Sequence, residues 1–283
     1  MKLYKIPEGV LLEDSESAFE LGLAWDELIN RNDLHGFLKS ALKEAKSISA
    51  NELELRKKKI LPPIGSQEVW AAGVTYLRSR EARMEESRKS GGADFYDKVY
   101  DAERPELFFK ALAHRVSGSG QDVFIRRDSS WNVPEPELVL FINSFGKIQA
   151  YTIGNDMSSR SIEGENPLYL PQAKVYEKSA ALGPCLFVPG RPIEQETIID
   201  MIIFRNGKQI FKDSVSIKKM KRSHDELAAF LFRECDFKTG VFLMTGTCLV
   251  PPNDFTLQVN DAVDISISGI GTLSNRIGMR SGT

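Results

Sequence analysis

Three acidic residues near the middle of the chain have types and spacing suited to binding a metal ion. Glu135 and Glu137 are two positions apart, and side chains i and i+2 of an extended strand point to the same face. If Asp156 joins them, three carboxylates repel one another unless protons or a cation intervene. Such oxygen ligands suit a hard divalent cation, and Mg²⁺ typically keeps several waters whose places a chelating substrate can take. We therefore expect Mg²⁺, with Mn²⁺ or Ca²⁺ as alternatives; the simpler reading is a solvated pair of strand glutamates and an unrelated aspartate.

A hairpin is the element that must bring these residues together. Residues 138–142 are an apolar run typical of a strand, and 143–147 have turn-forming residues. Residues 149–153 then read as the returning strand. Folding this hairpin places Asp156 beside Glu135.

Lys174 is a second residue of interest, because it follows a loop between two prolines and precedes an apolar segment. A lysine buried there needs an anionic partner, since an unpaired buried charge is costly. The alternative is an exposed lysine on a loop.

Composition sets the class of protein. The chain has 283 residues, of which 42% are hydrophobic and 27% charged, enough to bury a sizeable core. The net charge of −2 provides no basic field for nucleic acid or anionic lipid. The N-terminus lacks the apolar region of a signal peptide, and no apolar run approaches the roughly 20 residues of a membrane span. We expect a cytoplasmic protein with neither nucleic acid nor membrane as partner.

Cysteine and histidine usage excludes other chemistries. The three cysteines are scattered in apolar contexts and read as buried reduced thiols of a cytosolic protein, with a catalytic cysteine as the weaker alternative. The three histidines lack the spacing of a zinc site. Neither a Gly-x-Ser-x-Gly motif nor a P-loop is present.

The chain divides into two expected domains. Residues 1–64 form a small N-terminal domain, in which 51–59 are highly charged and are expected to be a polar edge. Prolines and a glycine in 61–65 mark the boundary. Residues 65–283 contain repeated hairpin signals with few helices, for example Asn206-Gly207 between two strand patterns. These patterns favour a second domain of α+β class that is mostly β.

A charged helix follows the buried-type strand at 69–74. Residues 76–89 alternate arginines, lysines and glutamates, and Ser90-Gly91-Gly92-Ala93 has the composition of a flexible hinge. This pattern is typical of a mobile lid, which we place at about residues 76–100. A plain solvated surface helix fits the pattern equally well.

Five short motifs occur in a fixed order between Trp70 and Ile277. They are PEPEL at 134–138, GNDMSSR at 154–160, LGP at 182–184, LMTGT at 243–247 and ISGIGT at 267–272. By these motifs the chain resembles the fumarylacetoacetate hydrolase superfamily. The resemblance implies a mixed β-roll catalytic domain, a homodimer or higher homo-oligomer, and a divalent metal held by Glu135, Glu137 and Asp156.

Two longer stretches, 96–111 and 165–176, resemble the branch of this superfamily that dehydrates 2-keto-3-deoxy sugar acids such as 2-keto-3-deoxy-D-arabinonate. That resemblance implies a catalytic site with Glu106 as the proton-transfer group and Lys174 against the substrate oxygens. It also implies a substrate pocket with Thr247 at the substrate carboxylate, and the other expected substrate-binding residues are Gly246, Arg80 and Phe108.

The expected function is therefore a metal-dependent lyase that acts on a small 2-oxo acid through a metal-stabilised enolate. Hydrolases of carbon–carbon bonds in this superfamily usually carry a His-Glu pair on the lid, but residues 76–89 contain no histidine. Arg80 and Arg83 are found there instead, although a lid glutamate (Glu81, Glu85 or Glu86) could still contribute. The first alternative is a hydrolase or decarboxylase of acylpyruvate or oxaloacetate type, and the second is a non-catalytic metal-binding oligomeric domain.

Overall fold

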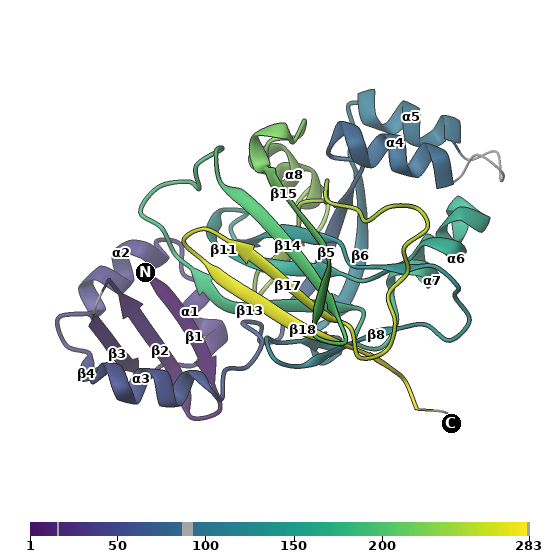
Figure 1. The fold of residues 1–283 in the computed structure, drawn as a ribbon. Coiled ribbons are helices and arrows are strands. Elements are labelled where there is room, and N and C mark those ends of the chain that lie inside the picture. Colours follow the sequence, from purple (N-terminus) through teal and green to yellow (C-terminus); the bar gives the residue numbers. More distant parts are fainter. Residues whose placement is uncertain (16, 87–92, 282–283) are drawn as a thin grey trace.

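Two facing β-sheets carry the fold (Figure 1). The structure, a computed structural model, describes residues 1–15, 17–86 and 93–281, without the side chains of 82, 83, 85, 86 and 93–96. Strands β10, β11 and β13 of the larger sheet pack against β14, β17 and β18 of the smaller one. The predicted fold, mostly β with a small N-terminal region, is confirmed.

The larger sheet runs in the order β4-β3-β2-β1-β13-β11-β10-β16-β5-β6, with β7 beside β13. Its first strands are β1 (Lys2–Ile6), β2 (Gly9–Asp14), β3 (Ser17–Leu21), β4 (Lys46–Ile48), β5 (Glu68–Gly73) and β6 (Glu106–Leu112). The others are β7 (Val116–Ser117), β10 (Pro136–Ile142), β11 (Ile148–Asp156), β13 (Ala180–Phe187) and β16 (Val241–Met244). Strands β9 (Asn132–Val133) and β12 (Ser158–Ser159) form a separate pair.

The smaller sheet has the order β15-β14-β17-β18-β8. Its strands are β8 (Asp122–Ile125), β14 (Ile198–Arg205), β15 (Lys208–Ser216), β17 (Ala262–Ile267) and β18 (Gly271–Met279). The predicted hairpin turn joins β14 to β15, where Asn206 and Gly207 adopt φ values of 51° and 74°. Both values are positive, as a type I′ turn requires.

Strand β10 is buried on both faces, which explains its uninterrupted apolar sequence. Leu138, Leu140 and Ile142 pack into the core between the two sheets. Val139 and Phe141 pack on the opposite face, in a core that includes buried residues of α1 (Trp25–Ile29) and α2 (Leu34–Ala41). Glu137 precedes Val139 on that second face, so a polar site begins where this apolar face ends.

The N-terminal region, purple in Figure 1, joins the larger sheet through antiparallel pairing of β1 with β13. The boundary placed at residue 64 stays a prediction. The charged stretch expected to be a polar edge, 51–59, belongs mostly to helix α3 (Ala50–Lys57), in which only Leu53 is buried. The side chain of Ser49 caps α3 by accepting a hydrogen bond from the backbone N–H of Glu52.

The remaining helices lie around the larger sheet. They are α4 (Leu77–Glu86), α5 (Ala93–Asp101), α6 (Arg160–Glu165), α7 (Leu170–Lys174) and α8 (His224–Leu231), with short 3-10 turns at Ala113–Arg115, Pro167–Tyr169 and Ile217–Lys219. Helix α4 is the predicted charged helix, while the hinge at 90–93 falls mostly outside the described residues. None of the helices in the described ranges has the length and apolar character needed to cross a membrane.

Candidate metal centre

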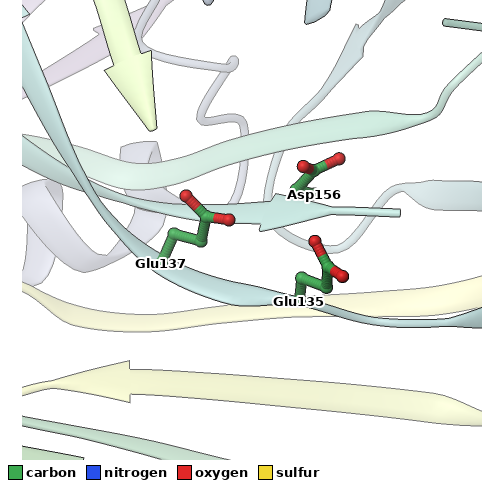
Figure 2. Close-up of side chains that lie close together, drawn as sticks. All are labelled: Glu135, Glu137 and Asp156. Atoms are coloured by element: carbon green, nitrogen blue, oxygen red, sulfur yellow. The ribbon is translucent and has the colours of Figure 1, made fainter. Parts of the chain in front are cut away.

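The predicted hairpin brings the three carboxylates together. Strands β10 and β11 pair antiparallel, with Glu137 opposite Gly154, and the backbone N–H of Asp156 donates to the carbonyl of Glu135 at 2.9 Å. Figure 2 shows the three side chains converging from these neighbouring segments. One carboxylate oxygen from each residue lies within 4.8 Å of the other two. All three residues are at most 3% exposed, so the alternative of solvated strand glutamates does not describe them.

Lys174, at the end of α7, is buried rather than exposed on a loop. Its Nζ lies 2.6 Å from Oε2 of Glu135 and 3.0 Å from Oδ2 of Asp156. It also donates to the hydroxyl of Ser158 at 2.6 Å. Lys174 therefore has the anionic partners expected of a buried lysine, and they are Glu135 and Asp156.

Two more buried cations reach the same carboxylates, and neither was predicted. Lys110, on β6, lies 2.5 Å from Oδ1 of Asp156. Arg160, at the start of α6, donates from Nη2 to Oε1 of Glu135 at 2.6 Å. The signal for Lys110 was present in the sequence, because a lysine inside an otherwise apolar strand needs a buried anion.

Lys110 also organises the backbone beside the carboxylates. Its Nζ donates to the carbonyl oxygen of Met157 at 2.9 Å and to that of Lys174 at 2.5 Å. The Lys110 ammonium group thus links the backbone of Met157, which follows Asp156, to the backbone of Lys174 at the end of α7.

Glu137 differs from the other two carboxylates. Its Oε2 accepts a hydrogen bond from the backbone N–H of Gly246 at 2.5 Å, and no ion pair joins it to a lysine or arginine in the described part of the chain. Burial raises the pKa of Glu137 well above its ordinary value, and the charges of Asp156 and Glu135 raise it further. Additional positive charge beside this carboxylate would therefore favour its ionised form.

Asp156 behaves in the opposite way. Burial alone would raise the pKa of Asp156, but Lys110 and Lys174 together bring it below the ordinary value. The site thus combines an Asp156 that forms ion pairs with two lysines and a Glu137 that forms none with the lysines and arginines of the described residues.

These residues fit a hard divalent cation. Three buried carboxylates offer oxygen ligands at one point, which is the donor set that Mg²⁺, Mn²⁺ and Ca²⁺ prefer. Burial and the neighbouring carboxylates raise the pKa of Glu137, and the positive charge of a bound cation would favour its ionised form.

A small cavity lies over the carboxylates. Its volume is about 20 Å³, and it is lined by Ala72, Gly73, Val74, Ser79, Phe108, Glu135, Glu137, Asp156, Arg160, Lys174 and Thr247. A space of this size holds about one water molecule. The cavity is therefore too small to hold a sugar acid unless the groups that line it move.

The other predicted site residues lie at different distances from this cavity. Phe108 and Thr247 line it, and Lys174 Nζ lies 5.6 Å from the centre of the Phe108 ring. Glu106 is half-buried at the start of β6, opposite Gly73, which lines the cavity.

Gly246 and Arg80 make contacts other than those expected of a substrate-binding residue. Gly246 uses its N–H on Glu137, as described above. Arg80 is directed toward α5, 3.6 Å from Asp97 and 3.9 Å from Asp101, and it is not among the residues lining the cavity. Contacts of these two residues with substrate stay predictions, and the side chains of Arg83, Glu85 and Glu86 lie outside the described residues.

Comparison with known proteins gives a consistent result. The family described as Fumarylacetoacetate (FAA) hydrolase C-terminal matches residues 69–278. The probable 2-keto-3-deoxyxylonate dehydratase of Haloferax volcanii is 49% identical over 217 residues, which cover 76% of this chain and 73% of the relative. The 2-dehydro-3-deoxy-D-arabinonate dehydratase of Saccharolobus solfataricus is 43% identical over 231 residues, covering 81% of this chain and 76% of the relative.

Solved structures agree over the whole chain. A 2-keto-3-deoxy-D-arabinonate dehydratase complexed with magnesium and 2,5-dioxopentanoate aligns with a TM-score of 0.85 at 34% identity, and the alignment covers 100% of both chains. A second crystal form of 2-keto-3-deoxyarabinonate dehydratase aligns with a TM-score of 0.86 at 35% identity, again over 100% of both chains.

Proposed function

Because this chain belongs to the fumarylacetoacetate hydrolase C-terminal family, we propose that it is a metal-dependent hydro-lyase that dehydrates a 2-keto-3-deoxy sugar acid. Relatives with 43% and 49% identity are dehydratases of such acids. A structural neighbour of the same class contains magnesium and a 2,5-dioxo acid. The cofactor is therefore a divalent cation, with Mg²⁺ first and Mn²⁺ or Ca²⁺ as alternatives.

The observation that carries this proposal is the buried carboxylate triad, surrounded by cationic side chains and adjoining a cavity. Glu135, Glu137 and Asp156 would hold the cation. When bound, the cation would supply Lewis acidity that stabilises the negative charge developing on a 2-oxo acid as its C3 proton leaves. A purely structural cation needs no cavity beside it, so the placement of the cavity supports a catalytic site.

The chain's own groups move the proton and orient the acid. Glu106 accepts the C3 proton, a contribution typically worth about 10²–10⁴-fold in rate. Lys174 stabilises negative charge on the bound acid, and Thr247 binds its carboxylate. Phe108, Gly246 and Arg80 complete the substrate pocket. Loss of the C3 proton and the C4 hydroxyl group removes one water and leaves a carbon–carbon double bond.

Entry of the acid requires the region around α4 to open. Ser79 of α4 lines the cavity, and the present cavity holds about one water molecule. We assign the lid to about residues 76–100, partly outside the described residues. Closure over the substrate would exclude water and strengthen each charge interaction at the site.

We also propose a cytoplasmic homodimer or higher homo-oligomer. Free cysteines support the compartment, because Cys185, Cys235 and Cys248 form no disulfide in the described structure. The oligomer is an inference from the family, and light scattering of the purified protein tests it.

The experiment for the reaction is an assay of the purified protein with Mg²⁺ and 2-keto-3-deoxy-D-arabinonate, following loss of water by mass spectrometry. Acylpyruvates and oxaloacetate serve as competing substrates in the same assay. Turnover of the sugar acid supports the proposal. Preferential cleavage of an acylpyruvate would replace it with a hydrolase, and absence of any turnover would indicate a non-catalytic metal-binding protein.

A further inference from the structure

The turn that ends strand β5 contacts both the proposed proton acceptor, Glu106, and the segment that binds the metal ligand Glu137. Gly73 is the last residue of β5, and Val74 and Thr75 follow it before α4 begins. Gly73 and Val74 line the cavity, and Thr75 is fully buried. These three residues are referred to here as the β5 turn.

Gly73 provides the space that the Glu106 carboxylate occupies. The two residues are cross-strand partners in β5 and β6. A Cβ atom placed on Gly73 would lie 1.8 Å from Oε2 of Glu106, far inside van der Waals contact. The φ angle of Gly73 is not in the positive range that favours glycine, so its backbone could accommodate other residues. The side chain of Glu106 is therefore the physical reason for a glycine at this position.

Thr75 acts on the opposite side, toward the metal ligands. Its hydroxyl donates to the carbonyl oxygen of Thr245 at 2.8 Å. The next residue, Gly246, has a φ of +98°, and a Cβ there would lie 2.0 Å from Oγ1 of Thr75. Gly246 in turn donates its N–H to Glu137. The Thr75 hydroxyl thus fixes the peptide segment that holds a carboxylate of the triad.

Val74 connects these two contacts in an unfavourable backbone conformation. Its φ is +53°, which is rare and unfavourable for a β-branched residue. The chain keeps this conformation while Val74 itself is buried at the cavity. Such strain persists where surrounding contacts hold it, and here the neighbouring residues supply those contacts.

We propose that Gly73 and Thr75 are positioning residues, which set the location of Glu106 relative to the metal ligand Glu137. This inference rests on the proposed function, in which Glu106 takes the proton and Glu137 binds the cation. Gly73 acts on the proton acceptor alone, and Thr75 acts on the metal ligand through Gly246. The two substitutions therefore have separable effects.

The first test is Gly73→Ala, with Gly22→Ala as the matched control because a Cβ on Gly22 would meet nothing within 4 Å. A misplaced reacting group costs about 10²-fold in rate. We expect Gly73→Ala to lower turnover and solvent deuterium exchange at C3 of 2-keto-3-deoxy-D-arabinonate by about that factor. Its affinity for Mg²⁺, measured by calorimetry, should equal that of the wild type. A deuterium exchange rate equal to that of Gly22→Ala would overturn the role of Gly73. A loss of Mg²⁺ affinity as large as the loss of exchange would overturn it as well.

The second test is Thr75→Val, with Thr75→Ser to restore the hydroxyl and Thr272→Val as an exposed control. Removing a group that orients a metal ligand typically weakens metal affinity about 10–100-fold. We expect that loss for Thr75→Val and wild-type Mg²⁺ affinity for Thr75→Ser. Thr75→Ala, which removes the hydroxyl without adding a second methyl group, should reproduce the loss if Thr75→Val does not fold. Unchanged affinity in the folded variants would overturn the role of Thr75.

Failure of the proposed function is visible separately. A wild type with no turnover refutes the dehydratase assignment. The positioning roles of Gly73 and Thr75 are still tested by calorimetry and by crystal structures of the wild type and Gly73→Ala. A displaced Glu106 carboxylate in Gly73→Ala supports the claim. An unmoved carboxylate refutes it.

Discussion

Nζ of Lys110 lies 2.5 Å from Oδ1 of Asp156, and the two side chains are 0% and 1% exposed. Burial lowers the pKa of Lys110, and the charge of Asp156 opposes that shift. Each charge therefore compensates the other in the interior, and removing Lys110 leaves the buried Asp156 carboxylate with Lys174 as its remaining ion-pair partner.

Lys110→Met should consequently destabilise the protein. Breaking a buried ion pair by removing one partner costs about 3–5 kcal/mol. Urea unfolding of the metal-free protein measures the loss, with Lys208→Met at an exposed position as the control. Adding Asp156→Asn to Lys110→Met should recover part of the stability, because the uncompensated carboxylate is gone. A Lys110→Met protein as stable as the control would show that the pair is dispensable.

Glu137→Gln should abolish Mg²⁺ binding while the fold remains intact. Glutamine keeps the size of the side chain and can still accept from Gly246, but it removes an anionic ligand from the triad. Titration calorimetry measures the binding, and circular dichroism checks the fold. Glu194→Gln, a change at an exposed site, should bind Mg²⁺ as the wild type does. Normal binding by Glu137→Gln would remove this residue from the ligand set.

Stability and metal affinity should depend on pH in opposite directions. The folded-state pKa of Glu137 is raised above 4.5, so its contribution to stability is full below pH 4.5 and is lost as pH rises through the folded-state pKa. The free energy of unfolding without metal should fall over that range, more in the wild type than in Glu137→Gln. Affinity for Mg²⁺ should rise over the same range, because the ligand must lose its proton.

Unfolding in urea at a series of pH values, with chelator and with Mg²⁺, measures both trends. The contribution of Asp156 to stability should change with pH in the opposite direction, at low pH. Its folded-state pKa is lowered below 3.8, so its contribution is present above that pH and is lost as pH falls through the folded-state pKa. Parallel curves for the wild type and Glu137→Gln without metal would contradict the assignment to Glu137.

Glu106→Gln should keep Mg²⁺ binding and lose proton transfer. Loss of a general base typically lowers the rate about 10²–10⁴-fold. Nuclear magnetic resonance in deuterated solvent follows exchange at C3 of the sugar acid, and calorimetry follows the metal. Glu103→Gln, at an exposed position shortly before β6, is the control. Exchange at the wild-type rate in Glu106→Gln would assign the base to another group.

The hairpin and its carboxylates were predictable from sequence because the information is local. The Glu-x-Glu spacing at 135–137 and the apolar run at 138–142 indicate one strand. Turn residues at 143–147 and a returning strand then place Asp156 beside Glu135. The Ser-x-x-Glu pattern at Ser223 likewise gives the N-cap of α8, where the serine side chain accepts from the N–H of Glu226.

The cationic half of the site was not predictable in the same way. Lys110 comes from β6 and meets the triad only because non-adjacent strands assemble in the order β11-β10-β16-β5-β6. Arg160 begins α6, four residues after Asp156, and is placed by the pairing of β12 with β9. Periodicity describes one element at a time, so it does not report such contacts. Helix α3 was missed for a related reason: its charged sequence shows no apolar stripe, and only Leu53 is buried.

The first residues of strand β1 meet the last residues of β13, where Lys2 pairs with Phe187 and Leu3 with Leu186. A chain shortened to residues 65–283 would leave these backbone groups open, as a template onto which strands of other molecules add. In the full chain, β2 and β3 extend the row outward until it stops at β4, which is three residues long and carries Lys46. A brief, charged final strand is poorly suited to recruiting neighbours, so we expect a chain shortened to residues 65–283 to aggregate more readily than the full chain.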